Sequence, residues 1–207
     1  MMNLKYKILS IILIITFIAT SCIIVKHKEA EDVAPTIQLS PKPVLPMSEE
    51  PLLSKDLDMM AFIPENWFFV DVENQANSNV FAVAVNPQYT MSAIFSTIPP
   101  STRVNEIIER EGLLGLARYS FETHQLKIPD IKLIGKFGII NMGNLSFAKY
   151  EYTTSSNSIA AQSIVFKSEL GKFYEFTLIP MAFTGRPLPK SEEINQIFYS
   201  ILATIQY

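Results

Sequence analysis

The sequence predicts an α+β fold in which a central, largely antiparallel sheet is covered by a long middle helix and a C-terminal helix. Three observations predict it. Runs of β-branched and aromatic residues, separated by short turn-forming segments, fill residues 59–98 and 131–180. One long helical segment lies between these two groups, and an amphipathic helix follows the second. Each helix must bury an apolar side against the sheet, so the expected arrangement is a sandwich.

Each group is expected to hold four strands, joined by connections of hairpin length. Pro- and Asn-rich turns separate the strands of the first group, which cover residues 59–63, 67–72, 80–85 and 90–98. The second group covers residues 131–142, 145–152, 160–170 and 172–180. Gly171 lies between the last two strands, so these should pair as an antiparallel hairpin.

The middle helix is expected to begin at Ser101 or Thr102, whose side chains can accept a hydrogen bond from a free amide of the first turn. Pro129 should end this region. Gly112 and Gly115 each weaken a helix by ~1 kcal/mol relative to alanine, so a break near the middle is also expected.

The closing helix is expected to be capped by Ser191, with Glu192 and Glu193 in its first turn, where the helix dipole favours acidic side chains. Its apolar residues follow the i, i+3, i+4, i+7, i+8 spacing of one buried face, and they are Ile194, Ile197, Phe198, Ile201 and Leu202.

The start of the chain has the three parts of a secretory signal: basic residues at Lys5 and Lys7, an apolar run at 8–18, and small residues at 19–21. Directly after them stands Cys22, the sole cysteine. The sequence at 19–22 resembles the lipobox of bacterial lipoproteins, although leucine is commoner where alanine stands here. The resemblance implies that residues 1–21 are a cleaved signal peptide and that Cys22 carries acyl chains such as palmitate.

An uncleaved membrane anchor remains the alternative. Apolar residues continue past the cysteine, so residues 8–25 approach the ~18 residues that a spanning helix needs. In either case the remainder of the chain is expected to be exported and held at a membrane surface.

Residues 22–57 are expected to form an anchored linker, because five prolines and several acidic residues occur between 29 and 51. Proline fixes φ and lacks an amide donor, so an extended spacer without a packed core is predicted. The folded domain should then cover residues 58–207.

Composition argues against several classes of function. The net charge is −3, with 17 basic against 20 acidic residues and no basic stripe, so no nucleic-acid partner is expected. The only histidines are His27 and His124. With Cys22 assigned to the anchor, no set of ligands for a zinc site remains, and no metal or other cofactor is expected.

At Phe62-Ile63-Pro64-Glu65-Asn66-Trp67 the chain resembles the PsbP-like superfamily, which includes the DcrB-type bacterial lipoproteins. The order of strands, long helix, strands and closing helix supports the resemblance over about residues 58–207. It implies an antiparallel sheet with helices on both faces. It implies no single activity, because the fold serves several functions. Pro64 and Trp67 are carried over only as structural residues.

The sequence does not predict an enzyme. His124 is the only plausible base in the domain, and at the end of a helix it is expected to be an exposed cation favoured by the helix dipole. No nucleophile motif or phosphate-binding loop occurs.

The loop at 181–188 carries residue types that are enriched at interfaces, so Met181, Phe183, Arg186 and Leu188 are a hypothetical partner-binding set. Alternatively, Phe183 and Leu188 pack on the core.

The expected function is therefore that of a membrane-anchored, extracytoplasmic and non-enzymatic lipoprotein, which binds or supports an envelope protein complex. The alternative is a lipid-binding or small-molecule-binding domain of the cell envelope that uses a cavity between sheet and helix.

Overall fold

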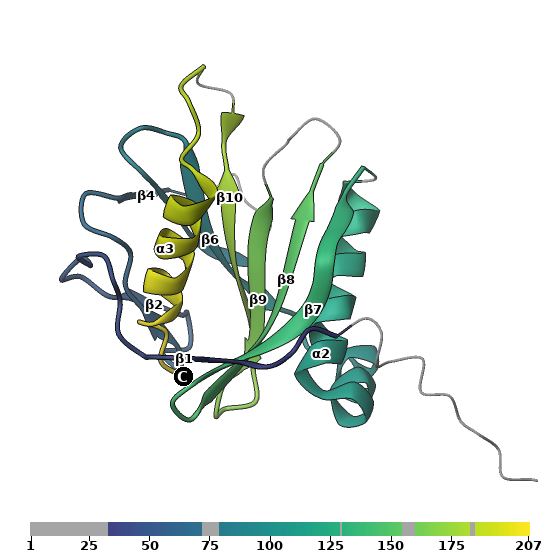
Figure 1. Ribbon diagram of the computed structural model, residues 1–207. Helices are drawn as coiled ribbons and strands as arrows, with labels where there is room; N and C mark the ends of the chain where they lie inside the picture. Colours follow the sequence, from purple (N-terminus) through teal and green to yellow (C-terminus); the bar gives the residue numbers. More distant parts are fainter. Residues whose placement is uncertain (1–32, 72–78, 129, 155–159, 183–184) are drawn as a thin grey trace, which may run out of the picture. The chain divides into compact units, whose positions relative to one another are not determined.

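The computed structural model describes residues 33–71, 79–128, 130–154, 160–182 and 185–207. Within these ranges the chain forms an eight-stranded sheet with a helix on each face, which confirms the predicted α+β fold (Figure 1). The strand order is β1 (Ile37–Leu39), β7 (Lys132–Met142), β8 (Leu145–Thr153), β9 (Ala161–Lys167), β10 (Phe173–Pro180), β6 (Met91–Ile98), β5 (Val80–Val85) and β4 (Phe68–Val70). Strand β1 is parallel to β7, and the remaining neighbours are antiparallel.

The predicted hairpin at Gly171 is confirmed, because β9 and β10 pair in antiparallel register around it. Gly171 has a φ of +80°, a conformation that glycine adopts without steric cost. The expected strand at 59–63 is shorter than predicted. It is reduced to β3 (Met60–Ala61), which pairs with β2 (Leu52–Leu53) in a separate small sheet.

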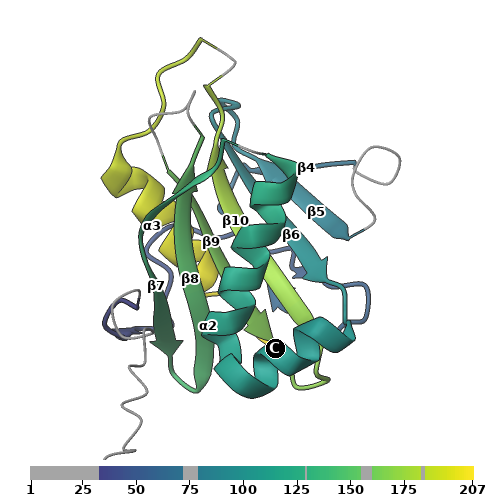
Figure 2. The same ribbon diagram turned by 90° about the vertical axis from the view of Figure 1, so that its right-hand side faces the viewer.

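Helix α2 (Thr102–Lys127) begins as predicted, because the Ser101 side chain accepts a hydrogen bond from the Val104 amide at 3.1 Å. The predicted break is also present and lies at Gly112, whose φ and ψ are 62° and −152°. Only glycine adopts this region readily, so the residue type permits the kink. Figure 2 shows α2 turning between its two parts.

Helix α3 (Ser191–Leu202) has the predicted buried face, but its cap differs from the prediction. Lys190 occupies the N-cap position, and no side chain caps the helix there. Ser191 is the first helical residue. Glu192 and Glu193 lie in the first turn as expected, so their charges complement the helix dipole.

Each face of the sheet has its own core. On the α3 face, the ring of Phe176 stacks between Phe95 and Phe198, at centroid distances of 4.9 Å and 5.4 Å. On the α2 face, Phe121 makes edge contacts with Tyr150 at 5.9 Å and with Phe137 at 6.1 Å. Aromatic rings in these arrangements attract one another beyond the burial of their area.

The segment 33–57 is not the unpacked linker that the sequence predicted, and the domain begins near residue 33 rather than 58. Strand β1 extends the sheet, and Leu52 is only 6% exposed. The Ser200 hydroxyl accepts hydrogen bonds from the amides of Val44 and Leu45, both at 3.1 Å. Prolines do not prevent this packing, because proline is compatible with sheet edges and extended backbone. The apolar residues between the prolines reach the core.

The predicted signal peptide, Cys22 and the alternative anchor lie outside the described residues. In the part of the chain that the structure describes, no helix is long and apolar enough to cross a membrane.

Candidate functional site

One face of the sheet is wider than the helix that covers it. Helix α2 contacts β7, β8 and β9, and Figure 2 shows β4 and β5 beside it without a helix in front of them. A helix is about 10 Å across and strands lie ~4.8 Å apart, so one helix covers only a few strands. Among the described residues, no helix therefore covers the α2 face of the remaining strands, which we call the open face.

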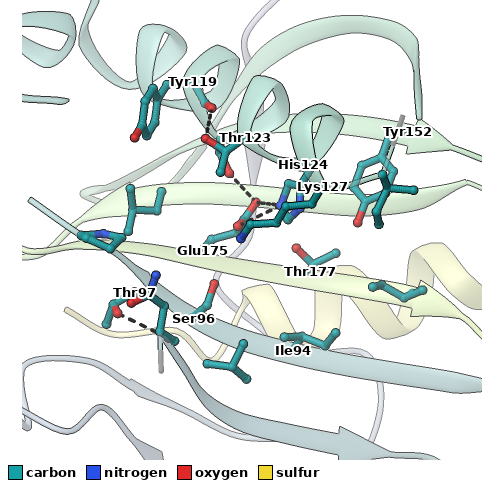
Figure 3. Close-up of a pocket in the computed structure, with 17 residues that line it drawn as sticks. Ile94, Ser96, Thr97, Tyr119, Thr123, His124, Lys127, Tyr152, Glu175 and Thr177 are labelled. Carbon is teal, nitrogen blue, oxygen red and sulfur yellow. Dashed lines mark hydrogen bonds and ion pairs between the residues drawn. The ribbon is translucent and has the colours of Figure 1, made fainter. Parts of the chain in front are cut away.

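A pocket of about 360 Å³ lies where this open face meets α2 (Figure 3). Strands β5, β6 and β10 and the C-terminal half of α2 line it. Its apolar walls are formed by Val80, Ile94, Ile98, Pro99, Ile128 and Ile179. A volume of this size is at the lower end of the range for small-molecule sites in proteins.

A buried carboxylate forms the polar floor of the pocket. The Glu175 side chain is 7% exposed and extends from β10 towards α2. Its Oε1 accepts hydrogen bonds from the Ser120 hydroxyl at 2.8 Å and from the Tyr150 hydroxyl. The Nε2 of His124 lies 3.1 Å from Oε1 and 3.2 Å from Oε2. Three side chains thus satisfy a charge that would be costly to bury alone.

The environment keeps Glu175 ionised. Burial acts to raise the pKa of its carboxyl, but the hydrogen bond and charge of His124 outweigh burial, together with bonds from Tyr150 and Ser120. The net effect lowers this pKa below its ordinary value. Burial, and then the Glu175 charge, raise the pKa of Tyr150 well above its ordinary value. Tyr150 therefore remains a neutral hydrogen-bond donor.

His124 is not exposed to the degree that was expected. Its side chain is 25% exposed, stacks on Tyr152 at 5.7 Å and pairs with Glu175. Sequence reasoning also missed Glu175, although a signal was present. In β10 the alternate residues Phe173 and Thr177 are buried on the α2 face, so a glutamate between them is a charge in an inward-facing position.

The order of hydrogen bonds in this cluster differs from a nucleophilic triad. In a triad the histidine stands between the hydroxyl and the acid. Here the Glu175 carboxylate stands between Ser120 and His124 and accepts a bond from each. The arrangement fixes a polar floor beneath apolar walls, which is suited to orienting a bound molecule.

The predicted partner-binding residues are spread over one loop. Met181 is half-buried, and its amide donates to the Thr90 carbonyl at 2.8 Å. Arg186 is exposed and donates from Nη1 to the Gln88 carbonyl at 3.2 Å. Leu188 is half-buried. Phe183 lies outside the described residues, so the set as a whole remains a prediction.

Within the described ranges, no group of three histidine, cysteine, aspartate or glutamate side chains is arranged to hold a metal ion.

Comparison with known proteins identifies the fold. No protein-family model and no curated protein matches the sequence. The solution structure of cyanobacterial PsbP (CyanoP) from Synechocystis sp. PCC 6803 matches with a TM-score of 0.53 and 15% identity, over 76% of this chain and 91% of that chain.

Two further structures match less well. The Ran-binding protein Mog1p of Saccharomyces cerevisiae has a TM-score of 0.48 and 7% identity, over 77% of this chain and 95% of its own. LpqN, which is involved in cell envelope biogenesis of Mycobacterium tuberculosis, has a TM-score of 0.40 and 15% identity, over 78% of this chain and 92% of its own. Likeness at such low identity concerns the fold alone. The similarity to CyanoP shows that this chain has the PsbP-like fold, as the segment from Phe62 to Trp67 and the order of elements predicted.

Proposed function

We propose that the protein is a membrane-tethered, extracytoplasmic lipoprotein whose domain binds a small amphiphilic molecule in the pocket beside α2. The pocket is the observation that carries this proposal. It combines apolar walls with a few fixed polar groups, which is the usual composition of small-molecule sites. A tether at Cys22, implied by the lipobox resemblance, places the domain near a source of amphiphiles.

The polar floor favours binding over a purely structural role. A buried polar cluster stabilises a fold weakly at best, because the desolvation of its groups offsets their attraction. Glu175 and His124 nevertheless occupy the junction between helix and sheet, and both line the pocket. Fixed polar groups at the base of an apolar pocket give a ligand a defined orientation. We propose no enzymatic activity.

Binding can be tested with the fluorescent amphiphile anilinonaphthalene sulfonate and the folded domain. The probe should bind the wild type, and Ile94→Trp should weaken binding, because the larger side chain occupies part of the pocket. Phe69→Trp is the matched control, since it enlarges a side chain on the opposite face of the sheet. Equal binding by wild type and Ile94→Trp would contradict the proposed pocket.

The tether is tested separately in cells. Cys22→Ser should move the protein from the membrane fraction to the soluble fraction if lipidation is the anchor. Retention of Cys22→Ser in the membrane, at full precursor length, would instead identify the uncleaved anchor.

A second candidate function is support of an envelope protein complex. It is favoured by Tyr89, which is 49% exposed and lies beside Gln88, whose carbonyl accepts a hydrogen bond from Arg186 of the loop at 181–188. Cross-linking in intact cells should recover one recurrent membrane complex, and Phe183→Ala with Arg186→Ala should reduce its recovery without unfolding the domain. Recovery of abundant neighbours alone would exclude this function.

A further inference from the structure

We infer that the ligand is a single-chain amphiphile with an anionic head, whose apolar chain leaves the pocket and lies across the open sheet face as far as β4. This inference rests on the proposed function, because it assigns the chemical class of the molecule that the pocket binds. It follows from the register of the strands beyond α2 and from the charges at the pocket mouth.

One row of side chains connects the pocket to the sheet edge. Thr177 in the pocket is the register partner of Ile94, Ile94 is the partner of Val83, and Val83 is the partner of Val70. Register partners on neighbouring strands point to the same face of a sheet. The row therefore runs from β10 to β4 on the α2 face, over three strand spacings of ~4.8 Å, or about 14 Å.

The row becomes more exposed with distance from the helix. Thr177 is 4% exposed, Ile94 and Val83 are half-buried, and Val70 is 41% exposed. Beside the outer end lies Phe68, which is on the same face and is 37% exposed, with Tyr89 packed on its ring at 5.4 Å. Apart from Thr177 the row is apolar, and it is continuous with the apolar pocket walls. Its shape and polarity fit one extended hydrocarbon chain.

The charges at the pocket fit an anionic head. Lys127 and His124 are the basic side chains of its lining, and Glu175 is its carboxylate. The Glu175 carboxylate is buried and already accepts bonds from three side chains. Lys127 is exposed, and Figure 3 shows its side chain extending from α2 across the pocket. A head that enters from solvent therefore meets an ammonium group before it meets the filled carboxylate, which favours a carboxylate or similar anion.

The opposite face of β4 supplies a matched control. Phe69 pairs with Ala84, which belongs to the α3-face core, so its side chain points away from the row. Phe69 is 45% exposed, close to the 41% of Val70. Substitutions at these two neighbours change similar amounts of exposed apolar surface on opposite faces of one strand.

The path of the ligand's hydrocarbon chain is tested by titration calorimetry with octanoate, dodecanoate and hexadecanoate, each below its micelle concentration. Affinity should rise from octanoate to hexadecanoate by up to ~4-fold for each methylene that reaches the row. Val70→Ser should weaken hexadecanoate binding by about threefold to tenfold and leave octanoate unchanged, because only the longer chain reaches β4. Phe69→Ser should change neither.

The head is tested with Lys127→Gln and with dodecyltrimethylammonium as the cationic counterpart of dodecanoate. Lys127→Gln should weaken dodecanoate binding by about fivefold, as expected for a lost charge contact of ~1 kcal/mol. Lys132→Gln, an exposed lysine on β7, is the control. Tighter binding of the cation than of dodecanoate would overturn the anionic head.

The two proposals fail in different ways. If Ile94→Trp weakens octanoate binding, but longer chains bind no better and Val70→Ser has no effect, the pocket stands and the path of the hydrocarbon chain along the row is overturned. Absence of binding by all three carboxylates and by anilinonaphthalene sulfonate would overturn both the chain assignment and the proposed function.

Discussion

His124 on α2 and Glu175 on β10 are joined across the interface between helix and sheet, with the histidine Nε2 3.1 Å and 3.2 Å from the two carboxylate oxygens. The surrounding interface is mostly apolar. This pair is thus a polar contact on which both the packing of α2 and the floor of the pocket depend.

Removing the Glu175 charge should destabilise the fold. In Glu175→Gln the buried donors lose a charged acceptor, and we expect a loss of about 3 kcal/mol in the free energy of unfolding. Urea denaturation at neutral pH measures it. Glu122→Gln is the control, because the Glu122 side chain is 59% exposed and its pair with Arg103 should contribute less than ~1 kcal/mol. Equal losses in the two variants would contradict the role of the buried pair.

Stability should fall with acidification, and Glu175 should account for part of the fall. The folded-state pKa of Glu175 is lowered from 4.5, so its contribution is complete above that value and is lost as pH falls through the lower folded pKa. Between about pH 6 and about pH 3, the melting temperature of the wild type should therefore drop more than that of Glu175→Gln. Parallel pH profiles of the two proteins would argue against an ionised Glu175.

Asp58 ties the turn at 54–58 to the β9–β10 hairpin. Its carboxylate accepts hydrogen bonds from the hydroxyls of Ser54 at 2.9 Å, of Ser168 at 2.6 Å and of Tyr174. Asp58→Ala should cost about 1–3 kcal/mol of unfolding free energy, because it leaves these donors without an acceptor.

The control for Asp58 is its neighbour Asp56, whose side chain is 49% exposed and pairs with Lys172. Asp56→Ala should cost at most ~1 kcal/mol, since exposed ion pairs contribute little. Guanidinium unfolding of both variants decides between a specific cluster and a general loss of acidic charge.

The packing of the N-terminal segment can be measured on β2. Leu52 is 6% exposed and Leu53 is 48% exposed, although they are adjacent. Leu52→Ala should cost about 2–4 kcal/mol through the cavity it leaves, whereas Leu53→Ala should cost under ~1 kcal/mol. Equal losses of stability in the two variants, measured by thermal unfolding, would show that this segment is an unpacked linker.

Replacing Gly112 at the kink of α2 should lower the stability of the protein. A Cβ at this position would meet no atom within 4 Å, so Gly112→Ala tests backbone strain without a steric clash. The φ and ψ of 62° and −152° are costly for alanine, and we expect a loss of about 1–3 kcal/mol. Glu109→Ala, an exposed helical position, is the control. A stability gain in Gly112→Ala would show that the helix straightens without cost.

Local patterns predicted most of the fold because period and turn chemistry are encoded within a few residues. The buried face of α3 and the hairpin at Gly171 are examples. The candidate site was not predictable in this way. His124 and Glu175 are 51 positions apart and meet only through tertiary packing, and a lone glutamate in a strand gives a weak signal. The packing of segment 33–57 was not predicted, because its prolines indicate an extended spacer and its apolar residues are too widely spaced to indicate a strand or a helix.

The packing of segment 33–57 also limits how far the domain could travel. With that segment folded, only ten residues, 23–32, separate Cys22 from Val33. Even fully stretched, this length of chain spans at most about 40 Å. If Cys22 carries the proposed lipid, this length sets the greatest distance of the domain from the membrane surface. The proposed pocket would then exchange its ligand close to the boundary between lipid and water.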